Sequence, residues 1–127
     1  MSEACSHGIR VQVRSQFVSE RSDPSRGHYF FAYRIRIQNE SERQVQLISR
    51  HWLITDAHGR TEEVQGPGVV GEQPTLAPGQ AFEYSSACPL ATPFGSMRGS
   101  YQMVDAQGEE FEAEIAPFRL AEPYAIN

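Results

Sequence analysis

The chain has 127 residues, the size of a single domain, and 39% of them are hydrophobic and 21% charged, as is typical of globular proteins. The formal charge is −5, and all eleven basic residues are arginine because the sequence contains no lysine. A net acidic chain with scattered arginines offers no clustered positive charge to phosphates, so we expect neither nucleic acid nor an anionic membrane as a partner.

Residues 1–8 are small and polar, so we expect a disordered N-terminal tail ahead of a single domain that spans residues 9–127. The tail has neither the basic start nor the apolar run of a secretory signal, which predicts a cytoplasmic protein. Cys5 and Cys88 have no metal-ligand or redox-motif spacing, and we expect both to be reduced thiols.

Apolar and polar residues alternate along the rest of the chain with the period of two that is typical of half-buried strands. Ile9, Val11 and Val13, for example, alternate with arginine and glutamine. No segment has the three- and four-residue apolar spacing of an amphipathic helix. We therefore expect about seven strands, which cover residues 9–17, 29–38, 45–54, 60–65, 80–88, 99–105 and 110–115.

The parity of this alternation changes at two places. Leu47 faces the expected core at an odd position, whereas Trp52 and Ile54 are the large apolar residues that follow it. One extra residue reverses the two faces of a strand, so we predict a β-bulge near residues 49–50, with burial on both faces as the alternative. A second bulge is predicted at Pro117, where the apolar pattern resumes on the other parity.

Two four-residue turns are near-copies of one another, Asp-Ala-His-Gly at residues 56–59 and Asp-Ala-Gln-Gly at residues 105–108. The aspartate side chain supports such a turn, and the glycine adopts the positive φ that it requires. Short strands separated by turns at fairly regular intervals predict an all-β fold, an antiparallel β-sandwich, with a small barrel as the alternative.

A long glycine-rich loop follows the strand that carries Trp52. Residues 66–71, Gly-Pro-Gly-Val-Val-Gly, match the letters of the dinucleotide-binding fingerprint. That fingerprint needs a helix behind it to supply the phosphate site, and Pro74 and Pro78 exclude a helix of useful length. A P-loop is excluded as well, because it needs a lysine.

Two interpretations of this loop remain open. In the first, its backbone amides bind a phosphate or pyrophosphate group, helped by the charge of a nearby arginine; the candidate residues are Gly66, Gly68, Gly71 and Arg60. In the second, the loop is a structural turn or a recognition loop that presents Val69 and Val70 to a partner. We expect Gly71 to be structural and to adopt a positive φ, because the chain reverses there after two β-branched residues.

The remaining polar residues do not predict catalysis. His51, Asp56 and His58 are close in sequence, but a turn separates the two histidines and no third nitrogen or sulfur ligand is near, so we expect no metal site. No serine or cysteine has a histidine partner at a spacing that indicates a nucleophile. We expect neither enzymatic activity nor a cofactor.

Two motifs carry a resemblance to a known family: Arg-x-Trp-x-Ile-x-x-x-x-Gly at residues 50–59 and Val-x-Gly-x-Gly-Val-Val-Gly at residues 64–71. Across residues 9–123 the chain resembles the bacterial ApaG (CorD) family. The resemblance implies an immunoglobulin-like or fibronectin type III-like sandwich, no established enzyme activity, and an indirect link to cobalt resistance and magnesium efflux. It also implies a role in protein–protein interaction, which is the accepted role of related eukaryotic domains.

Together, these observations predict a non-enzymatic protein-interaction module whose protein partner is unknown, with homodimer formation left open. The alternative is a small-ligand sensor that binds a phosphate-bearing small molecule at the loop of residues 66–71.

Overall fold

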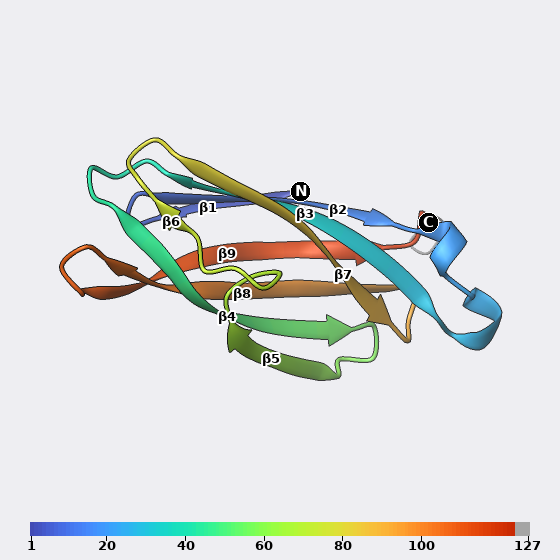
Figure 1. The fold of residues 1–127 in the computed structure, drawn as a ribbon. Coiled ribbons are helices and arrows are strands. Elements are labelled where there is room, and N and C mark those ends of the chain that lie inside the picture. The colour runs from blue at the N-terminus through green and yellow to red at the C-terminus, as the bar shows by residue number, and fades with distance from the viewer. Residues whose placement is uncertain (124–127) are drawn as a thin grey trace.

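The computed structural model describes residues 1–123, and the end of the expected domain, residues 124–127, lies outside the described part. The described chain folds into two antiparallel sheets packed face to face (Figure 1). Its elements are β1 (Ser2–Ser6), β2 (Ile9–Phe17), η1 (Ser19–Arg21), η2 (Pro24–Arg26), β3 (Tyr29–Asn39), β4 (Val45–Asp56), β5 (Thr61–Pro67), β6 (Thr75–Leu76), β7 (Ala81–Leu90), β8 (Phe94–Asp105) and β9 (Glu110–Ala121), where η denotes a short 3₁₀ helix. No helix in this range is long and apolar enough to cross a membrane.

Each sheet takes its strands from distant parts of the chain. The first sheet has the order β1-β2-β3-β7, and the second has the order β5-β4-β8-β9, with the short β6 paired to β4. All seven expected strands are present, and β1 and β6 are additional. The predicted antiparallel β-sandwich is therefore confirmed.

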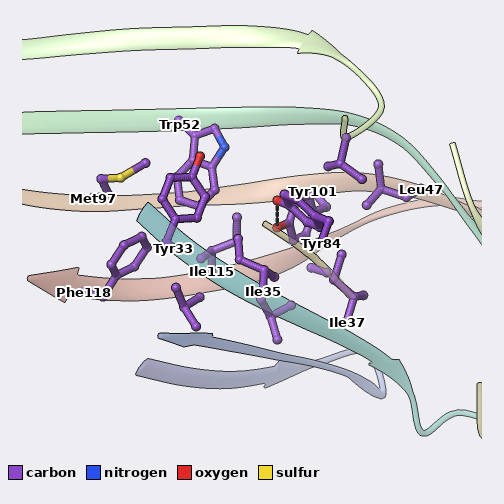
Figure 2. Close-up of a cluster of buried hydrophobic side chains, with 14 of the residues drawn as sticks. Tyr33, Ile35, Ile37, Leu47, Trp52, Tyr84, Met97, Tyr101, Ile115 and Phe118 are labelled. Atoms are coloured by element: carbon purple, nitrogen blue, oxygen red, sulfur yellow. Dashed lines mark hydrogen bonds between the residues drawn. The ribbon is translucent and has the colours of Figure 1, made fainter. Parts of the chain in front are cut away.

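The core lies between the two sheets and is built from the inward-facing residues of each strand. The rings of Tyr33 and Trp52 are 5.6 Å apart, and Trp52 meets Phe118 edge-on at 5.9 Å. The hydroxyls of Tyr84 and Tyr101, one from each sheet, share a hydrogen bond of 2.5 Å (Figure 2). This bond satisfies both phenol groups inside an otherwise apolar core.

The first predicted bulge is confirmed in β4. Leu47 pairs with Met103 and Ser49 pairs with Gln102, so Ile48 is an extra residue whose side chain is exposed. The extra residue reverses the two faces of the strand, and both halves of β4 can therefore direct their large apolar residues into the core.

The second predicted bulge is confirmed in β9. Met97 pairs with Phe118, and Gly99 pairs with Ile115, so β9 has one more residue than β8 between these two pairs. Pro117 lies in this stretch. A proline has no amide to donate to the ladder, so a bulge is one of the few places where a strand accommodates it.

The expectation of a disordered tail over residues 1–8 is wrong, because residues 2–6 form β1 and pair with β2. The segment has little apolar character and gave no strand pattern. His7 and Gly8 have φ values of 52° and 80°, and two consecutive positive φ values are typical of a type I′ hairpin turn. This His-Gly pair was the one local signal for the hairpin.

Hydroxyl groups attach β1 to the edge of β9 and close one side of the sandwich. The Ser2 hydroxyl donates to the Ala116 carbonyl at 3.0 Å, and the Ser6 hydroxyl accepts from the Glu114 amide at 2.8 Å. From β2, the Ser15 hydroxyl donates to the main chain of β9 at 2.8 Å. Figure 1 shows β9 alongside β1 and β2, whereas the β4–β5 hairpin projects on the opposite side of the molecule.

Candidate functional site

The glycine loop runs along the edge of β4 and connects β5 to β6. The Gly68 amide donates to the Ile48 carbonyl at 2.8 Å, and the Leu47 amide donates to the Pro74 carbonyl at 3.0 Å. These bonds hold residues 68–74 against the bulged part of β4. The loop is therefore built into the edge of the second sheet.

The loop reverses direction in a two-residue hairpin turn. Val69 and Glu72 exchange main-chain hydrogen bonds of 2.8 and 2.9 Å. Between them, Val70 and Gly71 have φ values of 43° and 82°. Two consecutive positive φ values indicate a type I′ turn, and the predicted positive φ at Gly71 is confirmed.

The two valines of this turn have opposite environments. Val69 was expected on the exposed surface, but only 1% of it is exposed, so this expectation is wrong. As the hydrogen-bonded residue of the turn, Val69 directs its side chain between the sheets and packs into the core.

Val70 is 55% exposed and adopts a backbone conformation that its side chain disfavours. A β-branched residue at positive φ is an outlier, because its Cβ crowds the neighbouring backbone. Strain of this kind costs about 1–3 kcal/mol. Since the Val70 side chain is mostly in solvent, burial contributes little to offset that strain.

The other two glycines of the motif have steric roles. A Cβ on Gly68 would lie 2.4 Å from the Glu72 carbonyl oxygen, so the turn cannot close around a larger residue. A Cβ on Gly66 would lie 3.1 Å from the Arg50 guanidinium, which packs directly over this glycine. The two glycines therefore leave room for the turn and for Arg50.

The arginine at the loop is Arg50 and not Arg60. Arg50 Nη1 donates to the carbonyls of Pro67 and Gly68, both at 2.9 Å. Arg60 precedes β5, about 20 Å from Gly66 along an extended strand. The amides of Gly68, Val69 and Glu72 all donate within the chain, so the loop leaves few donors for a phosphate group.

A pocket of about 390 Å³ opens beside this turn, between the edges of the two sheets. Tyr33 and Trp52 of the aromatic cluster in Figure 2 lie at its floor. Residues of β7 line one wall, residues of β5 including Glu62 line the other, and Val70 contributes to the rim. The pocket lies on the side of the sandwich opposite to the one that β1 closes.

Two titratable groups of the pocket wall, the Cys88 thiol and the Tyr33 phenol, are held in their protonated forms. Burial, with a smaller contribution from the Glu62 carboxylate, raises the pKa of the Cys88 thiol to about 11. Burial also raises the pKa of the Tyr33 phenol. Both groups therefore stay protonated at neutral pH. Cys5 and Cys88 are free thiols.

The histidines considered as metal ligands are spread along the β4–β5 hairpin. His51 Nε2 lies 2.8 Å from a Glu63 carboxylate oxygen on the outer face of the hairpin. Asp56 instead holds its own turn, since its carboxylate accepts the amides of His58 and Arg60 at 2.9 and 3.0 Å. Within residues 1–123, no group of three or more histidine, cysteine, aspartate or glutamate side chains is arranged to hold a metal ion.

A family model described as the ApaG domain matches residues 19–105. The chain belongs to the ApaG family. Protein ApaG of Anaeromyxobacter dehalogenans (strain 2CP-C) is 54% identical over 127 residues, which is 100% of each chain. Protein ApaG of Beijerinckia indica is 51% identical over 125 residues, which is 98% of this chain and 96% of that protein. The resemblance carried by the two sequence motifs is thus confirmed.

Solved structures share the ApaG fold described above. A crystal structure of an ApaA protein from Bordetella pertussis has a TM-score of 0.89 at 53% identity, and the match covers 91% of this chain and 94% of that one. The C-terminal domain of Wzt has a TM-score of 0.56 at 12% identity, with 94% of this chain and 76% of that chain covered. The second likeness shows the fold alone.

Sequence reasoning missed the two charged residues of the pocket lining, Arg50 and Glu62. Glu62 and Val64 are two positions apart on β5, so their side chains lie on the same, inward face. The alternation along this short strand could have predicted the position of Glu62. Arg50 lies next to the bulge, where parity cannot be read locally. Its position over Gly66 follows from the pairing of β4 with β5.

Proposed function

We propose that this ApaG-family protein is a non-enzymatic binding module that recognises a protein partner through Val70 and the pocket beside it. The supporting observation is the combination found at Val70, a left-handed backbone with a φ of 43° and an apolar side chain that is 55% exposed. Backbone strain tends to persist where it serves binding or catalysis. Loops held by a rigid scaffold commonly carry recognition residues.

The turn is also well placed to give a partner a defined surface. Val69 fixes it to the core, and the hydrogen bonds of Gly68 and Arg50 fix it to β4. A partner that contacts Val70 would therefore meet a preformed surface and would lose little entropy in ordering it. A module of this kind acts through its partner, so we expect any effect on cobalt or magnesium handling to be indirect.

Partner capture with a variant of the turn tests this function. Tagged wild-type protein and Val70→Asn are incubated with bacterial cytosolic lysate, and the retained proteins are identified by mass spectrometry. Asparagine followed by glycine is the pair that type I′ turns prefer, so the variant keeps the turn while it removes the apolar contact. We expect at least one protein to be retained by the wild type and reduced at least tenfold with Val70→Asn.

The matched control is His7→Asn, which changes the other non-glycine residue that has a positive φ within residues 1–123, in a turn on the opposite side of the sandwich. It should leave capture unchanged. Capture that survives Val70→Asn would exclude the turn from the interface, and the absence of any protein retained by the wild type would contradict the proposed function.

A further inference from the structure

β7 is the terminal strand of the first sheet, and the backbone pattern shows which of its groups face outward. The Asn39 amide donates to the Gln80 carbonyl at 2.9 Å, and the Val18 amide donates to the Phe30 carbonyl at 2.9 Å. Odd-numbered residues of β3 therefore direct their main-chain groups to β7, and even-numbered residues direct theirs to β2. Each odd-numbered residue of β3 pairs with an even-numbered residue of β7. The main-chain groups of the even-numbered β7 residues therefore bond to β3.

The odd-numbered residues Glu83, Ser85 and Ala87 consequently direct their amides and carbonyls away from the sheet. Within residues 1–123, no strand pairs with this side of β7 and no main-chain hydrogen bond reaches these groups. Natural proteins usually protect such an edge with charges, prolines, bulges or a covering segment. The stretch from Ser85 to Ala87 has none of these, whereas the edge of β9 is covered by the serines of β1 and β2.

On β7 the charged Glu83 and Pro89 lie on either side of the stretch from Ser85 to Ala87, whereas the facing edge, β5, is protected along its length. It carries Glu62 and Glu63 in succession and ends at Pro67. Glu62 lines the same pocket as Cys88 of β7, and its carboxylate contributes to the raised pKa of the Cys88 thiol. Among the described residues, no arginine or histidine forms an ion pair with the Glu62 carboxylate. The pocket thus combines an apolar floor with two charged groups, the Glu62 carboxylate and the Arg50 guanidinium, and the guanidinium donates to the carbonyls of Pro67 and Gly68.

We infer that an extended segment of the protein partner adds to the outer edge of β7 as a further strand. This inference rests on the proposed function and specifies how the partner binds. Successive side chains of a strand point to opposite faces, so every second residue of the segment enters the space between β7 and β5. One inward residue is apolar and fills the pocket beside Val70, and another on the same face is basic and pairs with Glu62.

Strand addition fits both the geometry and the charge of this site. Main-chain bonds to an open sheet edge supply affinity, and pockets for alternate side chains supply specificity. A pocket of about 390 Å³ with Trp52 and Tyr33 at its floor suits a large apolar side chain. Arg50 is engaged by the carbonyls of the glycine loop, whereas Glu62 has no ion-pair partner among the described residues, so Glu62 and the net charge of −5 favour a basic segment over an acidic one.

The test uses a phage-displayed library of random dodecapeptides panned against the full chain. We expect the selected peptides to share an apolar residue and an arginine or lysine at an even spacing from it. Hydrogen exchange with one synthetic selected peptide should slow at the amides of Glu83, Ser85 and Ala87. The outward amides of β5 should exchange as before.

Proline substitutions then remove one outward donor from each edge. Ala87→Pro should weaken peptide binding at least tenfold, because it deletes an amide that the added strand needs while leaving the bonds to β3 intact. Gln65→Pro, which deletes an outward amide of β5, is the matched control and should leave the affinity within twofold. Equal affinities for the two variants would overturn strand addition at β7.

Charge reversal tests the proposed chemistry of the partner. Glu62→Lys should weaken a basic peptide at least tenfold, and Glu63→Lys, on the outer face, should not. Failure to select any peptide, or selected peptides that are indifferent to Glu62→Lys, would overturn the inference. Binding that is lost with Val70→Asn but kept with Ala87→Pro would leave the proposed function standing without strand addition. Protection of the β7 amides in the peptide-free protein, together with a dimer in sedimentation, would instead assign this edge to a second copy of the chain.

Discussion

Asn39 is fully buried, and its side chain holds the turn between β3 and β4. Its amide group donates to the carbonyls of Arg43 and Leu76 at 2.7 and 3.0 Å, and its carbonyl accepts from the Ser41 amide at 3.0 Å. Because a buried carbonyl without a donor costs about 1–3 kcal/mol, we expect Asn39→Ala to lower the free energy of unfolding by roughly 2–3 kcal/mol in urea denaturation.

The control for this variant is Gln46→Ala. The Gln46 side chain donates to the Gln73 carbonyl at 3.2 Å, but this bond is exposed to water. Its loss should cost less than about 0.5 kcal/mol, since surface substitutions rarely do more. Similar losses for the two variants would contradict the importance of burial at Asn39.

Gly68 and Gly71 both have positive φ but differ in the space around them. A Cβ on Gly71 would have no atom within 4 Å, whereas a Cβ on Gly68 would lie 2.4 Å from the Glu72 carbonyl oxygen. Gly71→Ala should therefore cost about 1 kcal/mol from backbone strain alone, and Gly68→Ala should cost clearly more. Thermal unfolding of both variants checks the order, and equal losses would show that the close contact at Gly68 relaxes freely.

The Asp105 carboxylate makes the stability of the fold depend on pH. The Glu109 amide, together with the Gln107 amide and the Arg43 guanidinium, lowers the pKa of this carboxyl below its ordinary value of 3.8. Since the folded pKa is lower than the unfolded one, the carboxylate stabilises the fold above the unfolded pKa. That contribution is lost as the pH falls through the folded pKa.

We therefore expect Asp105→Asn to lower the free energy of unfolding at neutral pH. The difference in stability from the wild type should shrink as the pH falls through the folded pKa of Asp105. Urea midpoints measured at a series of pH values provide the check. Asp56→Asn is the matched control, because Asp56 makes the same two amide contacts in the other Asp-Ala-x-Gly turn, but within residues 1–123 no guanidinium group pairs with its carboxylate as Arg43 pairs with Asp105. A midpoint difference between Asp105→Asn and the wild type that does not change with pH would contradict the role given to the carboxylate.

At the scale of elements, β1 depends on hydroxyl groups more than on apolar burial. Two of its serines bond the main chain of β9. A side-chain hydrogen bond contributes about 1 kcal/mol, so Ser2→Ala combined with Ser6→Ala should lower the free energy of unfolding by about 1–2 kcal/mol. Hydrogen exchange should also become faster at the β9 amides. Ser96→Ala, at an exposed position of β8, is the control, and an equally small effect of both changes would show that β1 is held by its backbone pairing alone.

The elements that the sequence predicted correctly are those with a local signal. Both bulges follow from a change of parity within one strand, at Ile48 and near Pro117. β1 was missed because its residues are small and polar. Its pairing with β2 is local, but the hydroxyl bonds that attach it to β9 reach across more than 100 positions of the chain. No local pattern encodes such a contact.

At the scale of the whole molecule, the sandwich is closed along β9 and open between β7 and β5. The strand pattern of the sequence predicts two sheets, but it does not say which edges face each other. The same limit applies to the candidate site. Gly71 could be predicted from the chain reversal, whereas the burial of Val69 and the position of Arg50 depend on how β4 pairs with its neighbours.

Val70 connects the fold with the proposed function, because it is a strained residue that contributes little to folding. The direct measurement is the free energy of unfolding of Val70→Asn relative to the wild type, from urea denaturation without any partner. Relief of left-handed strain in a type I′ turn predicts an increase of about 1 kcal/mol. A decrease would show that Val70 stabilises the fold itself and would contradict the claim that it is kept for binding.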